Sequence, residues 1–380
     1  MKKTSFGAIF AAAIALFSCG TGEENISSDY LTLSVQPNDV VKLSDFAEKI
    51  EFIKLANDSL LKGIEQLVVD KNGNMLIRDA ERCFSLQLYA PDGKLICPIG
   101  KRGNGPGEYI FVEGIDIDNG KIFVDNPGKN GMMAYDMKGN FLPDIPEMNT
   151  VYHTNFVVKG DTLIKCHGGS YISFDINGQP YREQIKEREK EGTGEAPPLH
   201  IKSHLAKNID DGTVYWERHY NDTIFEAVGG NIKPFLHVDF GDLKLPEDIP
   251  VDNLISFNEE AKKYCTDISN FKISDGIISF MFDYRGSVYT CIYNRDTKKQ
   301  YVYRRLQNDI NNIPIMHPLI QAVQGKKIYF YVAPDIIAQI IDAIKESTKK
   351  EDLELLKKLT DTIGEVDEMD NPYIAVVTCK

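Results

Sequence analysis

Short apolar runs separated by tight polar turns follow one another along most of the chain. One unit recurs six times: an apolar run, a turn rich in Asp, Asn and Gly, and a second apolar run. In the first unit, Gln66–Val69 and Asn74–Ile77 flank such a turn. Because Asn and Gly adopt positive φ at little cost, two apolar runs around them predict a β-hairpin. The glycines of the six turns are Gly73, Gly120, Gly160, Gly212, Gly276 and Gly325.

A second hairpin follows about twenty residues later in five of the six units. In the first unit it consists of Phe84–Tyr89, a turn at Pro91–Gly93, and Lys94–Pro98. The units recur every 40 to 65 residues or so, roughly the period of propeller arrays, in which each small sheet buries its faces only against its neighbours. The chain is therefore predicted to be all-β, a six-bladed β-propeller of four-stranded antiparallel blades.

The sixth unit departs from the pattern after Lys327–Val332. Isoleucines then recur at helical spacing and a Lys/Glu-rich stretch follows, so we expect a helical insertion over residues 335–370. Tyr373–Thr378 is expected to form a late third strand, and Glu51–Leu55, from the start of the domain, to supply the fourth. Pairing the N-terminal and C-terminal strands in one blade would close the ring and leave only short outer edges.

The long insertions are all expected on one face of the ring. In a four-stranded meander the two hairpin turns share one face, and the other connections share the opposite face, which we call the insertion face. Loops held by a rigid scaffold often carry binding residues, so we expect function on the insertion face. The insertions are Lys101–Tyr109, Arg182–His200, Leu245–Cys265, Arg304–His317 and Asp335–Asp370.

The N-terminus has the form of an export signal. Lys2 and Lys3 precede a short apolar stretch, and Leu16-Phe17-Ser18-Cys19 resembles the bacterial lipobox, whose Cys is lipidated. The expected organisation is a signal peptide over 1–18, a lipidated N-terminus and tether over 19–45, and the propeller over 46–380. The protein is predicted to be an outer membrane lipoprotein facing the periplasm or the cell surface. An ordinary secretory signal is the alternative.

Charge and cysteine content narrow the possible partners. Lys and Arg number 43 against 56 Asp and Glu, a net charge of −13, which disfavours nucleic acid as a partner.

After Cys19 the cysteines show no metal-binding or disulfide spacing, so mostly buried free thiols are expected, with a Cys83–Cys97 bridge as the alternative. They are Cys83, Cys97, Cys166, Cys265, Cys291 and Cys379.

The chain resembles the Bacteroidetes six-bladed β-propeller lipoprotein family, which is similar in architecture to NHL-type propellers. The glycine-rich loop Gly100–Tyr109, with the sequence GKRGNGPGEY, carries most of the resemblance. Tyr220–Phe225, Val238–Gly241 and Asn371-Pro372-Tyr373 support it. The resemblance implies an exported, lipid-anchored propeller and implies no catalytic residues.

Two groups of residues are candidates for ligand binding on the insertion face. Lys101, Arg102, Glu108 and Tyr109 belong to the glycine-rich loop, whose alternative role is to shape a tight crossing between blades. The second group lies where second strands end, and polar side chains converging there could bind a glycan or a peptide. Turn formation by Asp and Asn is the alternative for this group. Its members are Arg78, Asp79, Asp125, Asn126, His167, Glu217, Arg218, Asp283 and Arg285.

No catalytic or cofactor motif accompanies these residues. The sequence has no HExxH zinc motif and no GxSxG nucleophile motif, so neither a catalytic residue nor a cofactor is predicted, with Ca²⁺ left open. The leading hypothesis is a non-enzymatic binding module for a glycan, a peptide or an envelope protein. A propeller hydrolase, lyase or lactonase with acidic residues at the channel mouth is one alternative, and a structural subunit of an envelope complex is another.

Overall fold

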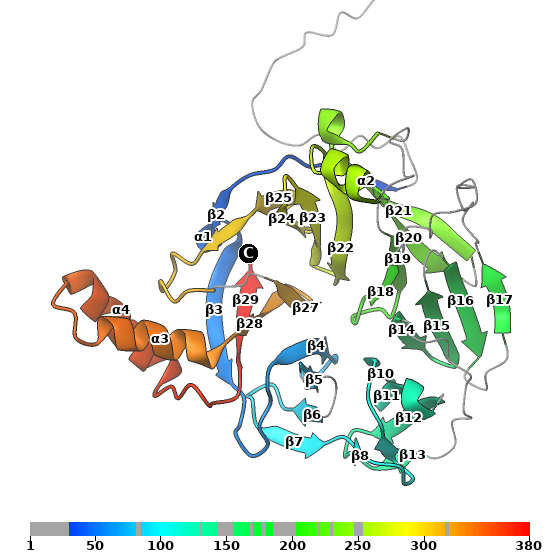
Figure 1. Cartoon of the computed structure of the whole chain (residues 1–380), viewed down its shortest axis with the longest axis horizontal. Coiled ribbons are helices and arrows are strands. Elements are labelled where there is room, and N and C mark those ends of the chain that lie inside the picture. Colours follow the sequence, from blue (N-terminus) through cyan, green and yellow to red (C-terminus); the bar gives the residue numbers. More distant parts are fainter. Residues whose placement is uncertain are drawn as a thin grey trace, which may run out of the picture.

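The computed structural model describes residues 30–80, 85–129, 131–142, 155–167, 170–175, 180–184, 203–218, 221–228, 231–246, 254–315 and 319–380. Small sheets stand side by side around a centre in this part of the chain (Figure 1). The first strand of each sheet lies innermost, next to the first strands of its two neighbours. The molecule therefore has a β-propeller fold.

Four of the sheets are meanders of consecutive antiparallel strands. The first contains β4 (Ile64–Val69), β5 (Met75–Asp79), β6 (Leu86–Tyr89) and β7 (Leu95–Pro98). The second contains β10 (Gly114–Asp118), β11 (Lys121–Asn126), β12 (Gly131–Asp136) and β13 (Phe141–Leu142). The third contains β14 (Asn155–Lys159), β15 (Thr162–His167), β16 (Ser170–Asp175) and β17 (Pro180–Gln184). Another contains β22 (Thr266–Ile273), β23 (Ile277–Tyr284), β24 (Ser287–Asn294) and β25 (Lys299–Tyr303).

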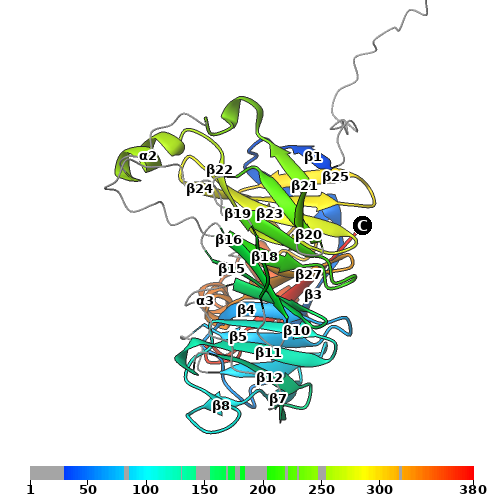
Figure 2. The same cartoon turned by 90° about the vertical axis from the view of Figure 1, so that its right-hand side faces the viewer.

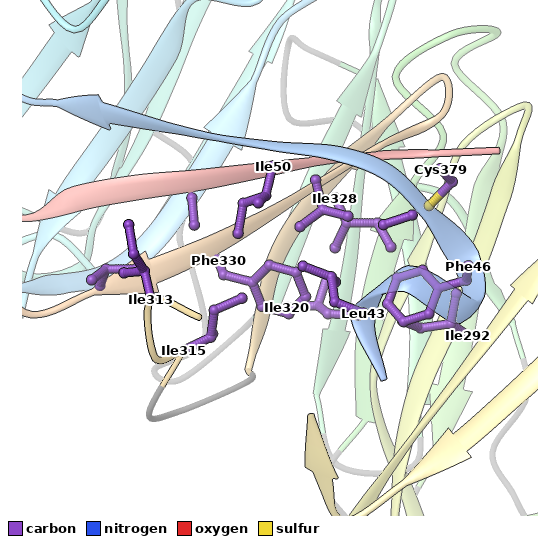
Figure 3. Close-up of a cluster of buried hydrophobic side chains, with 14 of the residues drawn as sticks. Leu43, Phe46, Ile50, Ile292, Ile313, Ile315, Ile320, Ile328, Phe330 and Cys379 are labelled. Carbon is purple, nitrogen blue, oxygen red and sulfur yellow. The ribbon is translucent and has the colours of Figure 1, made fainter. Parts of the chain in front are cut away.

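A further four-stranded sheet, the closing sheet, joins the two ends of the chain. It contains β27 (Ile320–Gln324), β28 (Lys327–Val332), β29 (Tyr373–Cys379) and β3 (Ala47–Lys54), all antiparallel. Ile374 on β29 lies opposite Ile53 on β3, so the N-terminal strand completes the sheet. Figure 3 shows the apolar side chains that pack beside it, including Leu43, Phe46 and Phe330, all nearly fully buried.

The expectation of six four-stranded antiparallel blades is wrong, because five sheets in the described part of the chain have four antiparallel strands. The remaining sheet has five strands: β18 (Ser203–Lys207), β19 (Val214–Arg218), β20 (Thr223–Val228), β21 (Asn231–Asp239) and β1 (Leu31–Ser34). β1 pairs with β21 in parallel, with Leu33 opposite Val238. The sequence analysis places Leu31–Ser34 in the tether, and the cause of the error is that an edge strand this short carries too little pattern to be recognised.

The helical insertion is only partly helical, which corrects the expected span of 335–370. Helix α3 (Pro334–Ile344) and helix α4 (Lys350–Ile363) occupy most of it and stand beside the ring (Figure 1). Gly364, with φ of +81°, ends α4, because this backbone conformation strains any residue with a side chain. Hydrogen bonds between Asp367 and Asp370 then form a turn that leads into β29.

The other elements belong to the connections and to the N-terminal segment. Strands β8 (Lys101–Arg102) and β9 (Glu108–Tyr109), helix α2 (Leu254–Ala261) and strand β26 (Arg305–Gln307) lie in connections between sheets. These connections, with α3 and α4, leave the sheets opposite the hairpin turns, and Figure 2 shows α2 and α3 toward the same side of the ring. Strand β2 (Val40–Lys42), helix α1 (Leu43–Phe46) and two short 3₁₀ helices, Pro127–Lys129 and Gly241–Leu243, complete the elements.

Two further properties bear on the sequence predictions. Cys97 carries a free thiol, which contradicts the alternative of a Cys83–Cys97 bridge, and Cys83 itself lies outside the described residues. Cys166, Cys265, Cys291 and Cys379 are free and buried. No helix among the described residues is both long enough and apolar enough to span a membrane. Cys19 lies outside the described residues.

Candidate functional site

The second strand of each sheet runs toward the insertion face and brings its last side chains there. Side chains along a strand alternate between its two faces, so neighbouring residues in this group face different sheets. Five of the predicted residues are nearly fully buried: Asp79, Asp125, Asn126, Glu217 and Arg218. The predicted group is therefore distributed over several interfaces between sheets rather than gathered in one cluster.

Two members of the group hold neighbouring backbone. One carboxylate oxygen of Asp79 accepts a hydrogen bond from the Lys62 amide at 3.0 Å. The side-chain oxygen of Asn126 accepts one from the Ile110 amide at 3.2 Å. Both contacts hold loops that enter from the preceding strand, so these two side chains bond to backbone elsewhere in the chain rather than to their own turns.

Asp125 and Lys165 form a buried pair of opposite charges between the second and third meanders. Phe123 on β11 and Leu163 on β15 pack in one apolar cluster, and each is two residues before a member of the pair, so Asp125 and Lys165 face the same interface. Asp125 is 0% exposed and Lys165 is 5% exposed. The pair lies at the end of that interface nearest the insertion face.

The polar atoms of this pair make no hydrogen bond to any described residue. Burial raises the pKa of Asp125 to about 6, the charge of Lys165 opposes the rise, and Glu113 adds to it. Burial also lowers the pKa of Lys165, and Asp125 opposes that change. Leaving a buried polar group without a hydrogen bond costs about 1–3 kcal/mol, and more for a charged group. The pair therefore gains free energy from any bound molecule that supplies the missing donors and acceptors.

Glu217, on β19, faces the interface between its own sheet and the sheet that begins with β22. One of its oxygens accepts a hydrogen bond from the Phe271 amide at 2.9 Å, and the other lies 3.5 Å from Nδ1 of His204. His204, opposite Glu217 on the innermost strand β18, is partly exposed. Burial raises the pKa of Glu217 to about 8, although the Phe271 hydrogen bond and the charge of Lys272 act against it. Glu217 is therefore largely protonated near neutral pH.

Stability should depend on pH through Glu217. Its pKa is about 8 in the folded protein and near 4.5 in the unfolded chain, so the folded state holds the extra proton between these values. The free energy of unfolding should then fall by about 1.4 kcal/mol per pH unit as the pH rises through this window. Glu217→Gln should remove this slope in urea unfolding, whereas Glu226→Gln, a change at a partly exposed residue of the same sheet, is the control. An identical slope in Glu217→Gln and the native protein contradicts the prediction.

Arg218 and Trp216 share the interface opposite to Glu217. The Arg218 guanidinium lies 4.9 Å from the ring centre of Trp216 and 5.5 Å from that of Phe225. Trp216 is fully buried in the apolar cluster between β14–β17 and β18–β21. The indole ring therefore packs between sheets and offers no surface on which a sugar could stack.

Arg78 spans the interface between the first and second meanders. Its guanidinium donates to the Val112 carbonyl at 3.3 Å and lies 3.8 Å from the Glu65 carboxylate. Beside it, Gln66 exchanges two hydrogen bonds with the Ile115 backbone, at 3.0 and 3.2 Å. The hydrogen bonds of Arg78 and Gln66 therefore join the two sheets at the end of the interface nearest the insertion face.

Hydrogen bonds within the glycine-rich loop hold it in place. Glu108 accepts from the Gly105 amide at 2.8 Å and pairs with Lys101 at 3.1 Å, and these two contacts lower its pKa. Lys129 donates to the carbonyls of Gly105 and Glu108 at 2.9 and 2.7 Å. A side chain at Gly103 would collide with the Glu108 carboxylate, at 2.1 Å from a Cβ atom. Tyr109 is buried in the adjoining apolar cluster, and Arg102 is exposed.

Three of the predicted site residues lie away from the buried pairs. Arg285 is exposed, with φ of +52° in the turn between β23 and β24, and its guanidinium lies over the Tyr284 ring at 5.0 Å. Asp283 is partly buried near the end of β23. His167 ends β15, and its side chain is outside the described part.

Sequence reasoning missed four residues that the structure places beside the predicted ones: Glu113, Lys165, His204 and Lys272. Lys165 could have been found, because a lysine inside the otherwise apolar run Leu163–Cys166 interrupts a buried strand. Among the described residues, no three His, Cys, Asp or Glu side chains are grouped so as to hold a metal ion.

Known proteins share the fold at low sequence identity. A family model described as "Domain of unknown function (DUF4934)" matches residues 31–378. The Bacteroides fragilis NCTC 9343 protein described as a "Putative exported protein" has a TM-score of 0.66 at 15% identity, covering 90% of this chain and 99% of that one. A member of the duf4221 family from Bacteroides vulgatus ATCC 8482 has a TM-score of 0.49 at 10% identity, covering 88% and 97%.

A streptogramin B lyase has a TM-score of 0.40 at 14% identity, covering 74% of this chain and 80% of that one. None of the curated proteins matches the sequence. At 15% identity, the likeness to the Bacteroides fragilis structure supports the fold alone.

Proposed function

Because the chain belongs to the DUF4934 family, whose function is unknown, its role has to follow from its own residues, and we propose that it is a binding protein. The ligand enters from the insertion face and reaches the interface between the second and third meanders. Asp125 and Lys165 are its polar contacts there.

The observation that carries this proposal is the unsatisfied state of that pair. A buried carboxylate and a buried ammonium without hydrogen bonds destabilise the free protein. Unsatisfied buried groups of this kind are rare in folded proteins, and each calls for a physical explanation such as a functional role or an ordered water or ion. Elsewhere on the insertion face the predicted residues bond to the protein itself, as Asp79, Asn126 and Glu108 do.

The chemistry of the pair favours a ligand that donates and accepts hydrogen bonds at adjacent positions. Asp125 accepts hydrogen bonds when ionised, and Lys165 only donates them. A hydroxyl group does both, so neighbouring hydroxyls of a glycan could donate to Asp125 and accept from Lys165 without adding charge to the interface. This favours a glycan over a peptide as the ligand.

The prediction that tests the proposal separates binding from folding. Asp125→Asn/Lys165→Met should leave the free energy of unfolding unchanged or raise it by about 1–4 kcal/mol, because two unsatisfied charges disappear. The same variant should lose the thermal shift that a glycan library produces with the native protein.

The matched control is Glu226→Gln/Lys233→Met, which removes a partly exposed acid–lysine pair 3.3 Å apart on β20 and β21. It should keep the glycan-induced shift. A shift retained by the Asp125/Lys165 variant would refute the assignment of the site, and a destabilised variant would show that the pair is structural.

An enzymatic role is a second candidate, because Glu217 is protonated near neutral pH and lies beside His204. A carboxylic acid with a pKa of about 8 can act as a general acid. Turnover of a glycoside or lactone substrate that Glu217→Gln abolishes would support this role, and equal turnover by both proteins would exclude Glu217 from it.

We further propose that a lipid on Cys19 anchors the protein to the outer membrane, as the lipobox-like sequence before it suggests. After detergent phase separation, the native protein should be found in the detergent phase and Cys19→Ala in the aqueous phase. Palmitate supplied to the cells should label the native protein and not the variant. Protease treatment of intact cells tests the surface position, because a protein facing the periplasm stays protected.

A further inference from the structure

We infer a second ligand site, separate from the insertion face, in a cavity between the first meander and the closing sheet. The cavity measures about 570 Å³ and lies near the hairpin turns of both sheets. Its walls come from the β4–β5 and β6–β7 turns and from strands β28, β29 and β3. Its size falls within the range of small-molecule sites.

Part of the cavity wall is apolar. Ile53, which is partly exposed, and Pro91, which is exposed, line it in front of the buried apolar cluster that contains Met75, Tyr329 and Val376. The Tyr329 hydroxyl donates a hydrogen bond at 2.9 Å to Gln324, which also lines the cavity. The apolar body of a ligand could therefore lie against this wall and leave water at a gain of about 25 cal/mol per Å² of apolar surface.

The charged residues at the rim leave two cations without partners. Glu51 pairs with Lys49 at 2.9 Å, and Asp92 pairs with Lys94 at 2.7 Å. Lys54, in turn, pairs with Asp370 at 2.8 Å.

Lys71 and Lys327 also line the cavity, one from each sheet. Neither side chain forms an ion pair or a hydrogen bond within the described part of the chain. The acids of the rim are therefore neutralised by other lysines. An anionic group entering the cavity would meet the free ammonium groups of Lys71 and Lys327.

The combination of apolar wall and unpaired lysines specifies the ligand class. It is a small carboxylate with an apolar body, whose carboxylate contacts Lys71 and Lys327 and whose body contacts Ile53 and Pro91. Such a ligand would bridge the first meander and the closing sheet, and binding would oppose separation of the two chain ends.

Octanoate serves as the probe, with the neutral alcohol octanol as its uncharged counterpart. Isothermal titration of the full chain should show saturable binding of octanoate and much weaker binding of octanol. Lys71→Gln/Lys327→Gln should raise the Kd for octanoate about tenfold or more, since each charge-assisted contact contributes about 1.5–3 kcal/mol and a tenfold change corresponds to about 1.4 kcal/mol. Both lysines are exposed, so the variant should fold as the native protein does.

Lys121→Gln is the matched control, because Lys121 is an exposed lysine beside a hairpin turn of the neighbouring meander and does not line the cavity. It should keep the native affinity for octanoate. Equal binding of octanol, unchanged affinity in the Lys71/Lys327 variant, or no saturable binding of octanoate would each overturn the inference.

Discussion

Replacing Asn371 by alanine is expected to lower the free energy of unfolding by about 3–5 kcal/mol, because three backbone groups lose their partners at once. The Asn371 side chain is fully buried where the strand that ends the chain meets the loop after β3. Its oxygen accepts from the Leu61 amide at 2.7 Å, and its nitrogen donates to the Ala56 and Ser59 carbonyls, both at 2.7 Å.

Urea unfolding of the two proteins measures this effect. Asn140→Ala is the control, because the exposed Asn140 side chain bonds only to Asp136 in the turn between β12 and β13, at 2.8 Å. The control should lose about 1 kcal/mol or less. A comparable small loss in Asn371→Ala would mean that the loop reorganises and that Asn371 does not hold the chain ends together.

Lys207→Met is expected to cost about 3–5 kcal/mol, because it leaves a buried carboxylate without its cation. The Lys207 side chain is 6% exposed, and its ammonium lies 2.6 Å from the Asp116 carboxylate, which is 5% exposed. The same ammonium donates to the carbonyls of Ile117 and Val158 at 2.8 and 2.9 Å. One side chain of β18 thus connects β10 and β14, the innermost strands of two other sheets.

A double variant distinguishes the loss of the Lys207–Asp116 ion pair from the cost of leaving Asp116 unpaired. Lys207→Met/Asp116→Leu should recover part of the loss, because it removes the unpaired carboxylate. The recovery is incomplete because the Val158 amide, which donates to Asp116 at 2.8 Å, also loses its partner. The partly exposed pair of Lys233 and Glu226 provides the comparison, and breaking it with Lys233→Met should cost less than about 1 kcal/mol. If Lys207→Met loses no more than that, or if the double variant is as unstable as the single one, the pair is not what holds the three strands together.

The parts of the fold that the sequence predicted are those with a local signal. The turns at Gly73, Gly120 and Gly160 have positive φ, at +83°, +71° and +58°. Glycine adopts such values at little cost, so its position in the sequence predicts the turn. The pairing of β3 with β29 was also foreseen, because a late apolar strand without a hairpin partner can pair only with a strand from elsewhere in the chain.

The errors arise where pairing partners are distant and patterns short. Leu31–Ser34 looks like part of a polar tether, and only its contact with Val238 and its neighbours makes it a strand. The candidate site depends even more on distant contacts. Asp125 was singled out as a polar residue at a strand end, whereas Lys165 becomes its partner only through the packing of two sheets, which no spacing along the chain encodes.

The path of the N-terminal segment has a mechanical consequence. After β1, the chain crosses to β26, where Asp39 pairs with Arg304 and Arg305 at 2.7 and 2.6 Å, and only then enters the closing sheet through α1 and β3. A pull on the residues before Leu31 therefore loads β1 first and the Asp39 contacts second. Both can give way while β3 remains paired with β29, so tension from an anchor would be relieved at the rim before it could open the ring.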